Sequence, residues 1–306
     1  MTGLAGRRVL VTGASGFLGT HLTRRLAEGG AEVHAVSRSS RAGVNGQRWW
    51  QADLADYGPV EDLLAAVRPH AVYHLSGHVT ATPDLDAVLP TFASLVASTV
   101  NLLTALTRIG CERLVLLSSL VEPGAEAGSF TPGSPYVAAK CAASAYGRMF
   151  QALYRAPVVV AHLGYTYGPG QDRRKLIPQV IAALTRGEAP QLTNGRLRAD
   201  WTYVDDMIDG LLAVGTAAPV VGRSVDLGSG TLISVRDVVQ RLARLAGGIA
   251  EPQFGAIPDR PSEPFRPADA AATFELMGWR ATTPLDEGLS RTLDWYRHKE
   301  PESCHA

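Results

Sequence analysis

The most constraining feature of this chain is the alternation of short apolar segments with amphipathic ones in its first half. The apolar segments lie at 9–11, 33–36, 71–75, 114–117 and 158–163. Amphipathic stretches such as "LVASTVNLLTALTRIG" lie between them. Near-continuous apolar strands joined by helices are typical of a doubly wound parallel sheet with helices on both faces. The regularity fades after about residue 165, which predicts an α/β lobe over 1–164 and a smaller α/β lobe over 165–306, with some later segments returning to the first.

Charge and composition exclude several classes of protein. Lys plus Arg and Asp plus Glu both number 29, so no bulk charge favours nucleic acid or an anionic membrane as a partner. No uninterrupted apolar run approaches the roughly 18 residues of a membrane-spanning helix. The N-terminus leads directly into a strand and leaves no room for a signal peptide. Three cysteines form neither a metal-ligand spacing nor an even disulfide framework, so we expect a soluble, cytoplasmic protein without a metal site.

The first predicted strand ends in a glycine-rich turn, "VTGASGFLGTHL", with Gly13, Gly16 and Gly19 three residues apart. In a strand–turn–helix context, the first glycine permits the tight turn and the second lets a pyrophosphate approach the backbone. The third allows the helix to pack closely on the strand. The helix N-terminus would supply amide donors to the phosphates. The turn therefore predicts a dinucleotide site, and Asp53, after the third strand, would reach the adenine.

The second predicted strand ends in "HAVSRSSR". An NAD site normally has an acidic residue here, about 20 residues past the glycines, which accepts hydrogen bonds from the ribose hydroxyls. This chain has Ser37 followed by Arg38, and the nearby acid Glu32 is at the wrong end of the strand. A hydroxyl and a guanidinium suit a 2′-phosphate, although Arg38 and Arg41 could also be solvated surface arginines. The pattern favours NADP (NADPH) over NAD.

A tyrosine and a lysine stand four residues apart in "SPYVAAK", so Tyr136 and Lys140 share one face of a predicted helix. Any helix places such a pair together, but the chain has only three lysines, which makes a chance match less common. A phenol has a pKa near 10, and a neighbouring ammonium would lower that pKa by favouring the phenolate. Such a pair can exchange a proton with a substrate oxygen.

Six ordered motifs carry a resemblance over residues 8 to about 297. They are "TGASGFLG", "SS" at 118–119, "SPYVAAK", "YGPG" at 167–170, "DWTYVDDM" at 200–207 and "LMGWRA…LDEGL…TLDWY". Together they resemble the extended short-chain dehydrogenase/reductase family, and within it the NAD(P)-dependent nucleotide-sugar epimerase/dehydratase branch. The resemblance implies a dinucleotide-binding Rossmann lobe, a C-terminal lobe that binds a nucleotide sugar, and homodimers built from the helices near 94–108 and 136–153.

The same resemblance implies roles for individual residues. The catalytic set would be Ser119, Tyr136 and Lys140, with the family spacing selecting Ser119 over Ser118. The implied cofactor contacts are Gly13, Ser15, Gly16, Phe17, Leu18, Gly19, Ser37, Arg38, Ser39, Asp53, Leu54, Leu75, Ser76, Gly77, Tyr136, Lys140 and Leu163. The implied substrate contacts are Ser119, Tyr136, Tyr165, Lys175, Arg198 and Arg260.

The chain also departs from the family pattern. Tyr165 replaces a frequent Asn, and Ala199 replaces an Arg, so Arg198 or Arg196 would have to reach the diphosphate. His78 and His162 could contact substrate or could be satisfied structural histidines. These departures predict a sugar pocket that differs from that of the common epimerases.

Two neighbouring residues reduce the number of reactions that the site could catalyse. Leu120 and Val121 stand where the family's 4,6-dehydratases carry an Asp–Glu pair, and aliphatic side chains cannot exchange protons. The related decarboxylases also keep an acid at the second position. Two activities remain, an NADPH-dependent ketoreductase and an NAD-dependent 4-epimerase, while the complete Ser–Tyr–Lys set disfavours a non-enzymatic sensor. The NADP pattern favours reduction of a nucleotide-linked 4-keto-6-deoxy sugar, with a dTDP handle implied by the resemblance alone.

Overall fold

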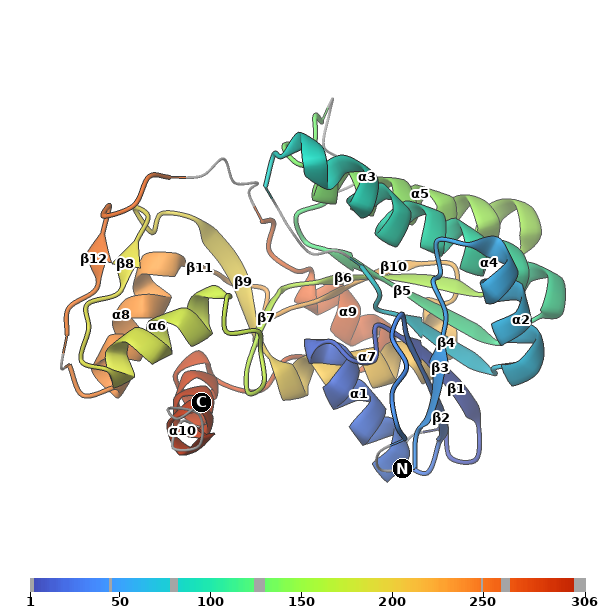
Figure 1. Ribbon diagram of the computed structural model, residues 1–306, viewed down its shortest axis with the longest axis horizontal. Helices are drawn as coiled ribbons and strands as arrows, with labels where there is room; N and C mark the ends of the chain where they lie inside the picture. The colour runs from blue at the N-terminus through green and yellow to red at the C-terminus, as the bar shows by residue number, and fades with distance from the viewer. Residues whose placement is uncertain are drawn as a thin grey trace.

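The computed structural model describes residues 3–43, 46–77, 82–123, 130–248, 250–259 and 265–299. Figure 1 shows two lobes, the larger of which is built on a seven-stranded sheet. Its strands are β1 (Arg8–Thr12), β2 (Glu32–Ser37), β3 (Arg48–Gln51), β4 (Ala71–His74), β5 (Arg113–Ser119), β6 (Val158–Leu163) and β10 (Ser224–Leu227). They are all parallel and lie in the order β10-β6-β5-β4-β1-β2-β3. The predicted Rossmann-type α/β fold is confirmed.

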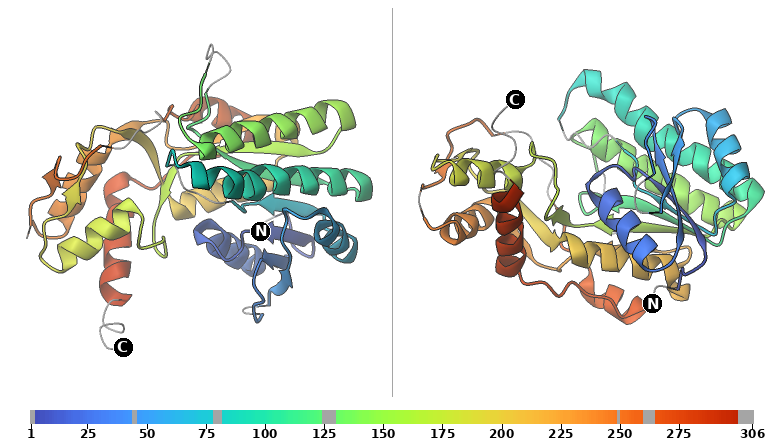
Figure 2. Two further views of the ribbon diagram at one scale, coloured as in Figure 1. Left: turned by 45° about the horizontal axis from the view of Figure 1, so that its top comes forward. Right: turned by 60° about the horizontal axis from the view of Figure 1, so that its bottom comes forward.

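Helices cover both faces of this sheet, which explains why its central strands, such as β5 and β6, are buried along their whole length, whereas the edge strand β3 has exposed polar residues at both ends. Alternate strand residues point to opposite faces, so Val9 and Val11 join one core cluster and Leu10 joins the other. The covering helices are α1 (Phe17–Glu28), α2 (Tyr57–Val67), α4 (Ser98–Ile109), α5 (Pro135–Tyr154), α7 (Val204–Thr216) and α9 (Ala270–Met277). Figure 2 shows α4 and α5 side by side on one face, with α1 and α7 on the other.

Among its described residues, the smaller lobe contains two short sheets and three helices. Strands β7 (Tyr165–Tyr167), β9 (Arg198–Tyr203) and β11 (Leu232–Ser234) form one sheet, and β8 (Gln191–Leu192) pairs with β12 (Gln253–Phe254). The helices are α6 (Leu176–Thr185), α8 (Val235–Leu245) and α10 (Leu285–Lys299). Strand β10 and helices α7 and α9 pack in the larger lobe although they follow residue 164. The division of the chain at 164 stays a prediction.

A long helix in the larger lobe differs from what the sequence predicted. Elements η1 (Leu85–Ala87), α3 (Val88–Thr91), the π-helical η2 (Phe92–Ala97) and α4 run on as one largely apolar helix of 25 residues. By length and composition alone, this helix within the described part of the chain could cross a membrane. Polar residues such as Ser94 and Thr99 interrupt its apolar runs, which is why a search for uninterrupted runs missed it. Its inner face packs on α2 and α5.

Candidate functional site

The glycine turn between β1 and α1 is built for close backbone packing. Gly13 has a φ of 65°, and a Cβ there would lie 2.8 Å from the carbonyl carbon of Leu75. A Cβ on Gly19 would lie 2.2 Å from the carbonyl oxygen of Gly13. No side chain caps α1 at Gly16, and its first turn carries no acidic residue. The amides at this helix N-terminus are therefore available to an anion such as a phosphate.

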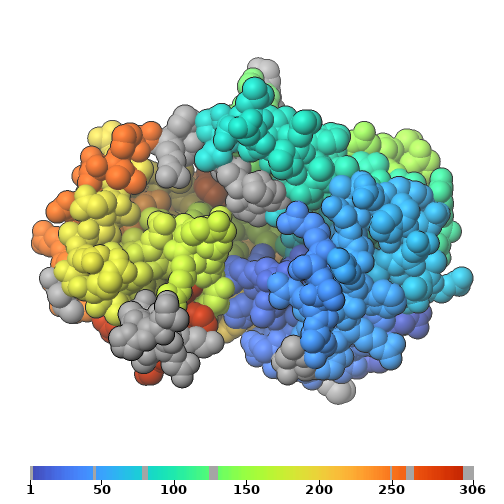
Figure 3. Space-filling model, viewed as in Figure 1, coloured from blue at the N-terminus to red at the C-terminus, as the bar shows by residue number. Residues whose placement is uncertain are grey.

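A cavity of about 1150 Å³ extends from this turn along the carboxyl ends of the neighbouring strands. It reaches the first residues of the smaller lobe at Asp172, Arg174 and Lys175, and Figure 3 shows the surface hollowed where the lobes meet. Twelve of the predicted ligand contacts line it: Gly13, Ser15, Gly16, Ser37, Arg38, Ser39, Asp53, Leu54, Leu75, Ser76, Gly77 and Lys175.

Other residues of the cavity do not match the prediction. Tyr136 and Lys140 do not line it and are described below. Four other predicted cofactor contacts do not line it either: Phe17, Leu18, Gly19 and Leu163. Pro90, Ala93, Ser94 and Ser98 do line it, although no sequence motif marked them. These four residues share one face of the long helix, and only the packing of that helix beside β4 brings them to the cavity.

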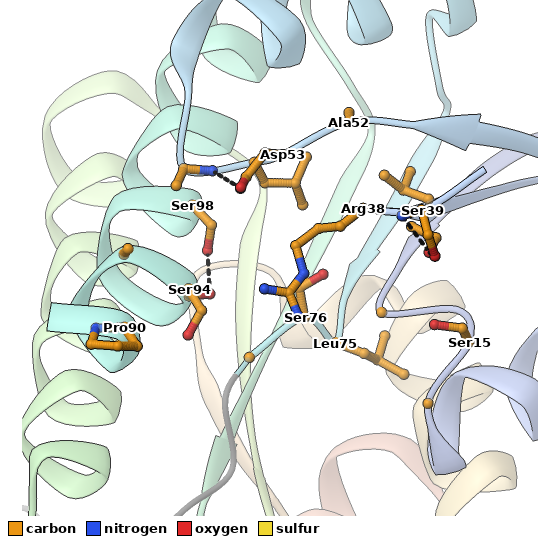
Figure 4. Close-up of a pocket in the computed structure, with 18 of the residues that line it drawn as sticks. Ser15, Arg38, Ser39, Ala52, Asp53, Leu75, Ser76, Pro90, Ser94 and Ser98 are labelled. Atoms are coloured by element: carbon orange, nitrogen blue, oxygen red, sulfur yellow. Dashed lines mark hydrogen bonds between the residues drawn. The ribbon is translucent and has the colours of Figure 1, made fainter. Parts of the chain in front are cut away.

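The end of β2 gives the cavity a rim of hydroxyl and guanidinium groups. Figure 4 shows Arg38 pointing into the cavity between Asp53 and Ser76. The Ser39 amide donates to the Ser37 hydroxyl at 3.3 Å. Arg41 also lines the cavity, with its guanidinium carbon 5.5 Å from the centre of a Trp49 ring.

The carboxylates near this rim are engaged elsewhere. Glu32, at the start of β2, lies 3.4 Å from Arg48 and 3.3 Å from His34. Asp53 accepts the amide of Ala55 at 3.0 Å. No carboxylate stands at the end of β2 itself, where the sequence has Ser37.

Helix α5 positions the predicted tyrosine and lysine. Ser134 caps the helix by accepting the Val137 amide at 3.3 Å, and Pro135 occupies the first helical position, where its fixed φ favours the helix. Tyr136 and Lys140 then lie one turn apart on the same face, directed at the end of β5. The start of the helix was thus encoded locally, in the residues just before the pair.

The end of β5 brings Ser119 to Tyr136, and a side-chain hydrogen bond joins the two. Ser118 faces a different group, because its hydroxyl lies within hydrogen-bond distance, 3.2 Å, of the Ser144 hydroxyl. Successive strand residues point to opposite sides, so only one of the two serines can reach the phenol. We call Ser119, Tyr136 and Lys140 the Ser–Tyr–Lys trio.

The electrostatics of the trio differ from the sequence expectation. Burial raises the pKa of Tyr136 to about 12, the charge of Glu122 acts in the same direction, and the Ser119 hydrogen bond opposes them. Lys140 donates to the Leu117 carbonyl at 2.7 Å, and burial lowers its pKa to about 8 against the charge of Glu122. The expected lowering of the Tyr136 pKa by Lys140 is therefore not found in the protein alone. The spacing of the motif could show neither the burial of Tyr136 and Lys140 nor the nearby carboxylate of Glu122.

The trio lies beside the cavity and is not among the residues that line it. Leu95 of the long helix forms a small core cluster against which Tyr136 packs. The same leucine lies against Gly77, where an added Cβ would be 2.2 Å from its side chain. Leu95 therefore belongs to the cluster that Tyr136 packs against and also lies behind Gly77 of the cavity wall.

The predicted substrate residues are only partly brought together. Lys175, which precedes α6, lines the cavity. Tyr165 in β7 packs on Trp201 with ring centres 4.5 Å apart, and burial raises the pKa of its phenol. Arg198 donates to the Leu232 carbonyl at 2.7 Å and is not among the residues that line the cavity. Arg260 and His78 lie outside the described residues.

His162 is buried in the interior, and its two ring nitrogens each contact a carboxylate. Its Nε2 is 3.5 Å from Glu122 and its Nδ1 is 3.4 Å from Asp226. Asp226 in turn accepts hydrogen bonds from both terminal nitrogens of Arg266, one of them at 2.7 Å. Burial lowers the pKa of His162, but its interactions with the two carboxylates outweigh burial and raise that pKa above its ordinary value. The ambiguity left by the sequence is thus resolved in favour of a buried polar network.

Comparison with known proteins agrees with this arrangement. The model of the NAD dependent epimerase/dehydratase family matches residues 9–228. This chain belongs to that family. A UDP-glucose 4-epimerase of Mycolicibacterium smegmatis is 28% identical, covering 95% of this chain and 99% of the relative. A dTDP-glucose 4,6-dehydratase of the same organism is 29% identical, covering 96% of this chain and 94% of the relative.

Solved structures show the same relationship. The structure of MoeE5 in complex with UDP-glucose and NAD is 30% identical to this chain, with a TM-score of 0.82. The alignment covers 95% of this chain and 99% of MoeE5. The similarity to MoeE5 therefore extends over both lobes.

Proposed function

We propose that this protein is an NADPH-dependent reductase of a nucleotide-linked 4-keto-6-deoxy sugar with a dTDP handle. The observation that carries the proposal is the rim at the end of β2, where Ser37, Arg38, Ser39 and Arg41 line the cavity. An acidic residue at this strand end accepts the ribose hydroxyls of NAD and would repel a 2′-phosphate. Guanidinium and hydroxyl groups instead donate to that phosphate.

Two features of the cavity support a dinucleotide there: its volume of about 1150 Å³, and the uncapped N-terminus of α1, whose first turn carries no acidic residue. When bound, the nicotinamide would supply the hydride. Tyr136 would donate its phenolic proton to the substrate carbonyl oxygen as that oxygen becomes an alkoxide. Ser119 would donate a hydrogen bond to the same oxygen. Lys140 would hold the cofactor ribose and, as an ammonium, stabilise the phenolate left on Tyr136.

Dehydratase chemistry is disfavoured by the segment after β5. Leu120 and Val121 are both buried aliphatic residues, so neither can remove a ring proton. Glu122 follows them, but its carboxylate accepts a hydrogen bond from the Ser144 hydroxyl at 2.9 Å and contacts His162. It is buried in the interior and is not positioned to replace the missing acid.

An NAD-dependent 4-epimerase is the second candidate. The Ser–Tyr–Lys trio serves both reactions, and the relatives described above include an epimerase and a protein in complex with NAD. An epimerase retains one cofactor through its cycle, whereas a reductase exchanges its cofactor at every turnover. The cofactor extracted from freshly purified protein separates the two, because stoichiometric NAD would favour the epimerase.

Exchanging the groups at the end of β2 is expected to change the cofactor preference. Arg38→Ala should weaken NADPH binding by about 2 kcal/mol, or roughly 30-fold, and leave NADH almost unchanged, because a charge-assisted hydrogen bond to the 2′-phosphate is lost. Ser37→Asp should move the preference toward NADH, because the new carboxylate repels the phosphate and accepts the ribose hydroxyls. Dissociation constants for both cofactors, measured by fluorescence titration, check the prediction.

Arg48→Ala is the matched control, since Arg48 lies on the adjacent strand β3 and pairs with Glu32 away from the rim. It should leave the NADPH to NADH ratio unchanged. Equal affinity of the wild-type protein for both cofactors, with no effect of either rim variant, would favour the epimerase. Activity itself is tested with dTDP-4-keto-6-deoxyglucose and NADPH, and with UDP-glucose and NAD for the alternative.

We also propose that the working unit is a homodimer formed through the long helix and α5. Apolar side chains on these helices are exposed, among them Leu89, Phe92 and Tyr146. Light scattering of the purified protein gives the mass of the assembly directly, and a monomer at micromolar concentration would contradict this part of the proposal.

A further inference from the structure

A chain of buried polar groups lies behind the Ser–Tyr–Lys trio, and none of them exchanges a proton with the substrate in the proposed reaction. Glu122 accepts the Ser144 hydroxyl at 2.9 Å on one side and lies 3.5 Å from His162 on the other. His162 leads to Asp226, and Asp226 is paired with Arg266. All of these side chains are buried except that of Arg266, which is partly exposed. Ionised groups are costly to bury, so a network of this size needs a physical reason.

Helix α5 connects this network to the trio. Tyr136, Lys140 and Ser144 are spaced four residues apart and therefore lie in a row on one face of the helix. Ser144 donates to Glu122, so the carboxylate stands at the end of this row, one turn beyond Lys140. Glu122 is also anchored through its backbone, because its amide donates to the Ser119 carbonyl at 3.0 Å.

Lys140 is a buried amine whose hydrogen-bond acceptor is a neutral group, the Leu117 carbonyl. A carbonyl dipole compensates an ammonium less than a carboxylate does, and desolvation favours the uncharged amine. Within the described part of the chain, Glu122 is the acidic residue whose charge acts on both Lys140 and Tyr136. The carboxylate of Asp226 lies on the far side of His162 and is bound by Arg266.

We propose that Glu122 is a positioning residue of the catalytic site, held by Ser144 and His162 so that its charge keeps Lys140 in the ammonium form at neutral pH. The inference rests on the proposed function only in taking Lys140 as a catalytic group. It adds a carboxylate, outside the aliphatic pair Leu120–Val121, to the groups on which proton transfer depends.

The direction in which the Lys140 pKa changes when Glu122 is replaced follows from the groups that face Glu122. Helix α5 presents Tyr136 and Lys140, β6 presents His162 with Asp226 of β10 behind it, and the Arg266 side chain donates to the Glu122 carbonyl oxygen at 3.3 Å. Burial brings the pKa of Lys140 down to about 8, and Glu122 opposes that fall. Without the Glu122 charge the pKa of Lys140 falls further, and the ammonium is lost at a lower pH.

Lysine NMR measures this directly, because the chain has only three lysines. In protein labelled with ¹³C and ¹⁵N at lysine, the Lys140 signal is identified by its absence in Lys140→Arg. Its titration midpoint is expected to fall by about one pH unit in Glu122→Gln, as for the loss of a nearby opposite charge. The Lys175 and Lys299 signals serve as internal references. Since no substrate is needed, the result does not depend on which sugar the enzyme reduces.

Asp226→Asn is the matched control, because it removes a carboxylate from the same network on the far side of His162. It should shift the Lys140 midpoint by less than half as much as Glu122→Gln. An equal shift in both variants, or an unchanged or raised midpoint in Glu122→Gln, would overturn the proposal. If Glu122→Gln does not fold, Glu122→Asp, which moves the charge away by one methylene, should lower the midpoint by a smaller amount, and no shift there would equally overturn it.

Activity provides a second readout for the same variants. If Lys140 must be an ammonium, the alkaline limb of the pH profile of kcat should move to lower pH in Glu122→Gln together with the NMR midpoint. A shifted NMR midpoint with no activity on any sugar would contradict the proposed function and leave the role of Glu122 intact. An unshifted midpoint in an active reductase would contradict the role of Glu122 and leave the proposed function intact.

Discussion

Tyr136→Phe is expected to lower turnover by about 10² to 10⁴-fold while the affinity for NADPH stays near that of the wild type. The phenyl ring keeps the packing against Leu95 and Ala139 but has no proton to give to the substrate oxygen. Stopped-flow measurement of NADPH oxidation gives the rate, and fluorescence titration gives the cofactor affinity.

Tyr146→Phe is the matched control, because Tyr146 lies on the same helix with an exposed side chain. This variant should turn over within a factor of two or so of the wild type, since a surface hydroxyl takes no part in the reaction. If Tyr136→Phe retains activity within a factor of a few, Tyr136 does not donate the proton and the assignment of the trio is wrong.

Ser119→Ala is expected to reduce turnover by about 10²-fold, which corresponds to the removal of one donor to the oxygen that gains charge. The hydrogen bond between Ser119 and Tyr136 places this hydroxyl beside the phenol. The hydrogen bond also lowers the pKa of Tyr136, so its removal should shift the titration of that phenol upward. Product formation from dTDP-4-keto-6-deoxyglucose, followed by chromatography, measures the loss.

Ser118→Ala distinguishes the two serines at the end of β5. Ser118 contacts Ser144 and the buried network, so its loss should cost some stability and much less turnover than the loss of Ser119. A larger loss of turnover in Ser118→Ala than in Ser119→Ala would show that Ser118 contacts the reacting oxygen.

The sequence predicted the elements whose signals are local. Strands β5 and β6 are recognisable because a parallel strand covered on both faces must be apolar throughout. The start of α5 is encoded in Ser134 and Pro135, and the turn before α1 in its glycines. Eleven of the twelve predicted contacts that line the cavity, all except Lys175, follow from one rule, that the carboxyl ends of parallel strands meet at one edge of the sheet.

By itself, then, the sequence determined the α/β fold, the glycine turn and the spacing of Tyr136 and Lys140, because each depends on neighbours within a few residues. The tertiary structure alone decided that Glu122 would be buried beside His162, forty residues later in the chain, and that Asp226 and Arg266 would complete the network. It also decided the pKa of Tyr136, because a pKa depends on burial and on charges brought together from distant strands. Desolvation and Coulomb interactions act through space, so no spacing along the chain could reveal them.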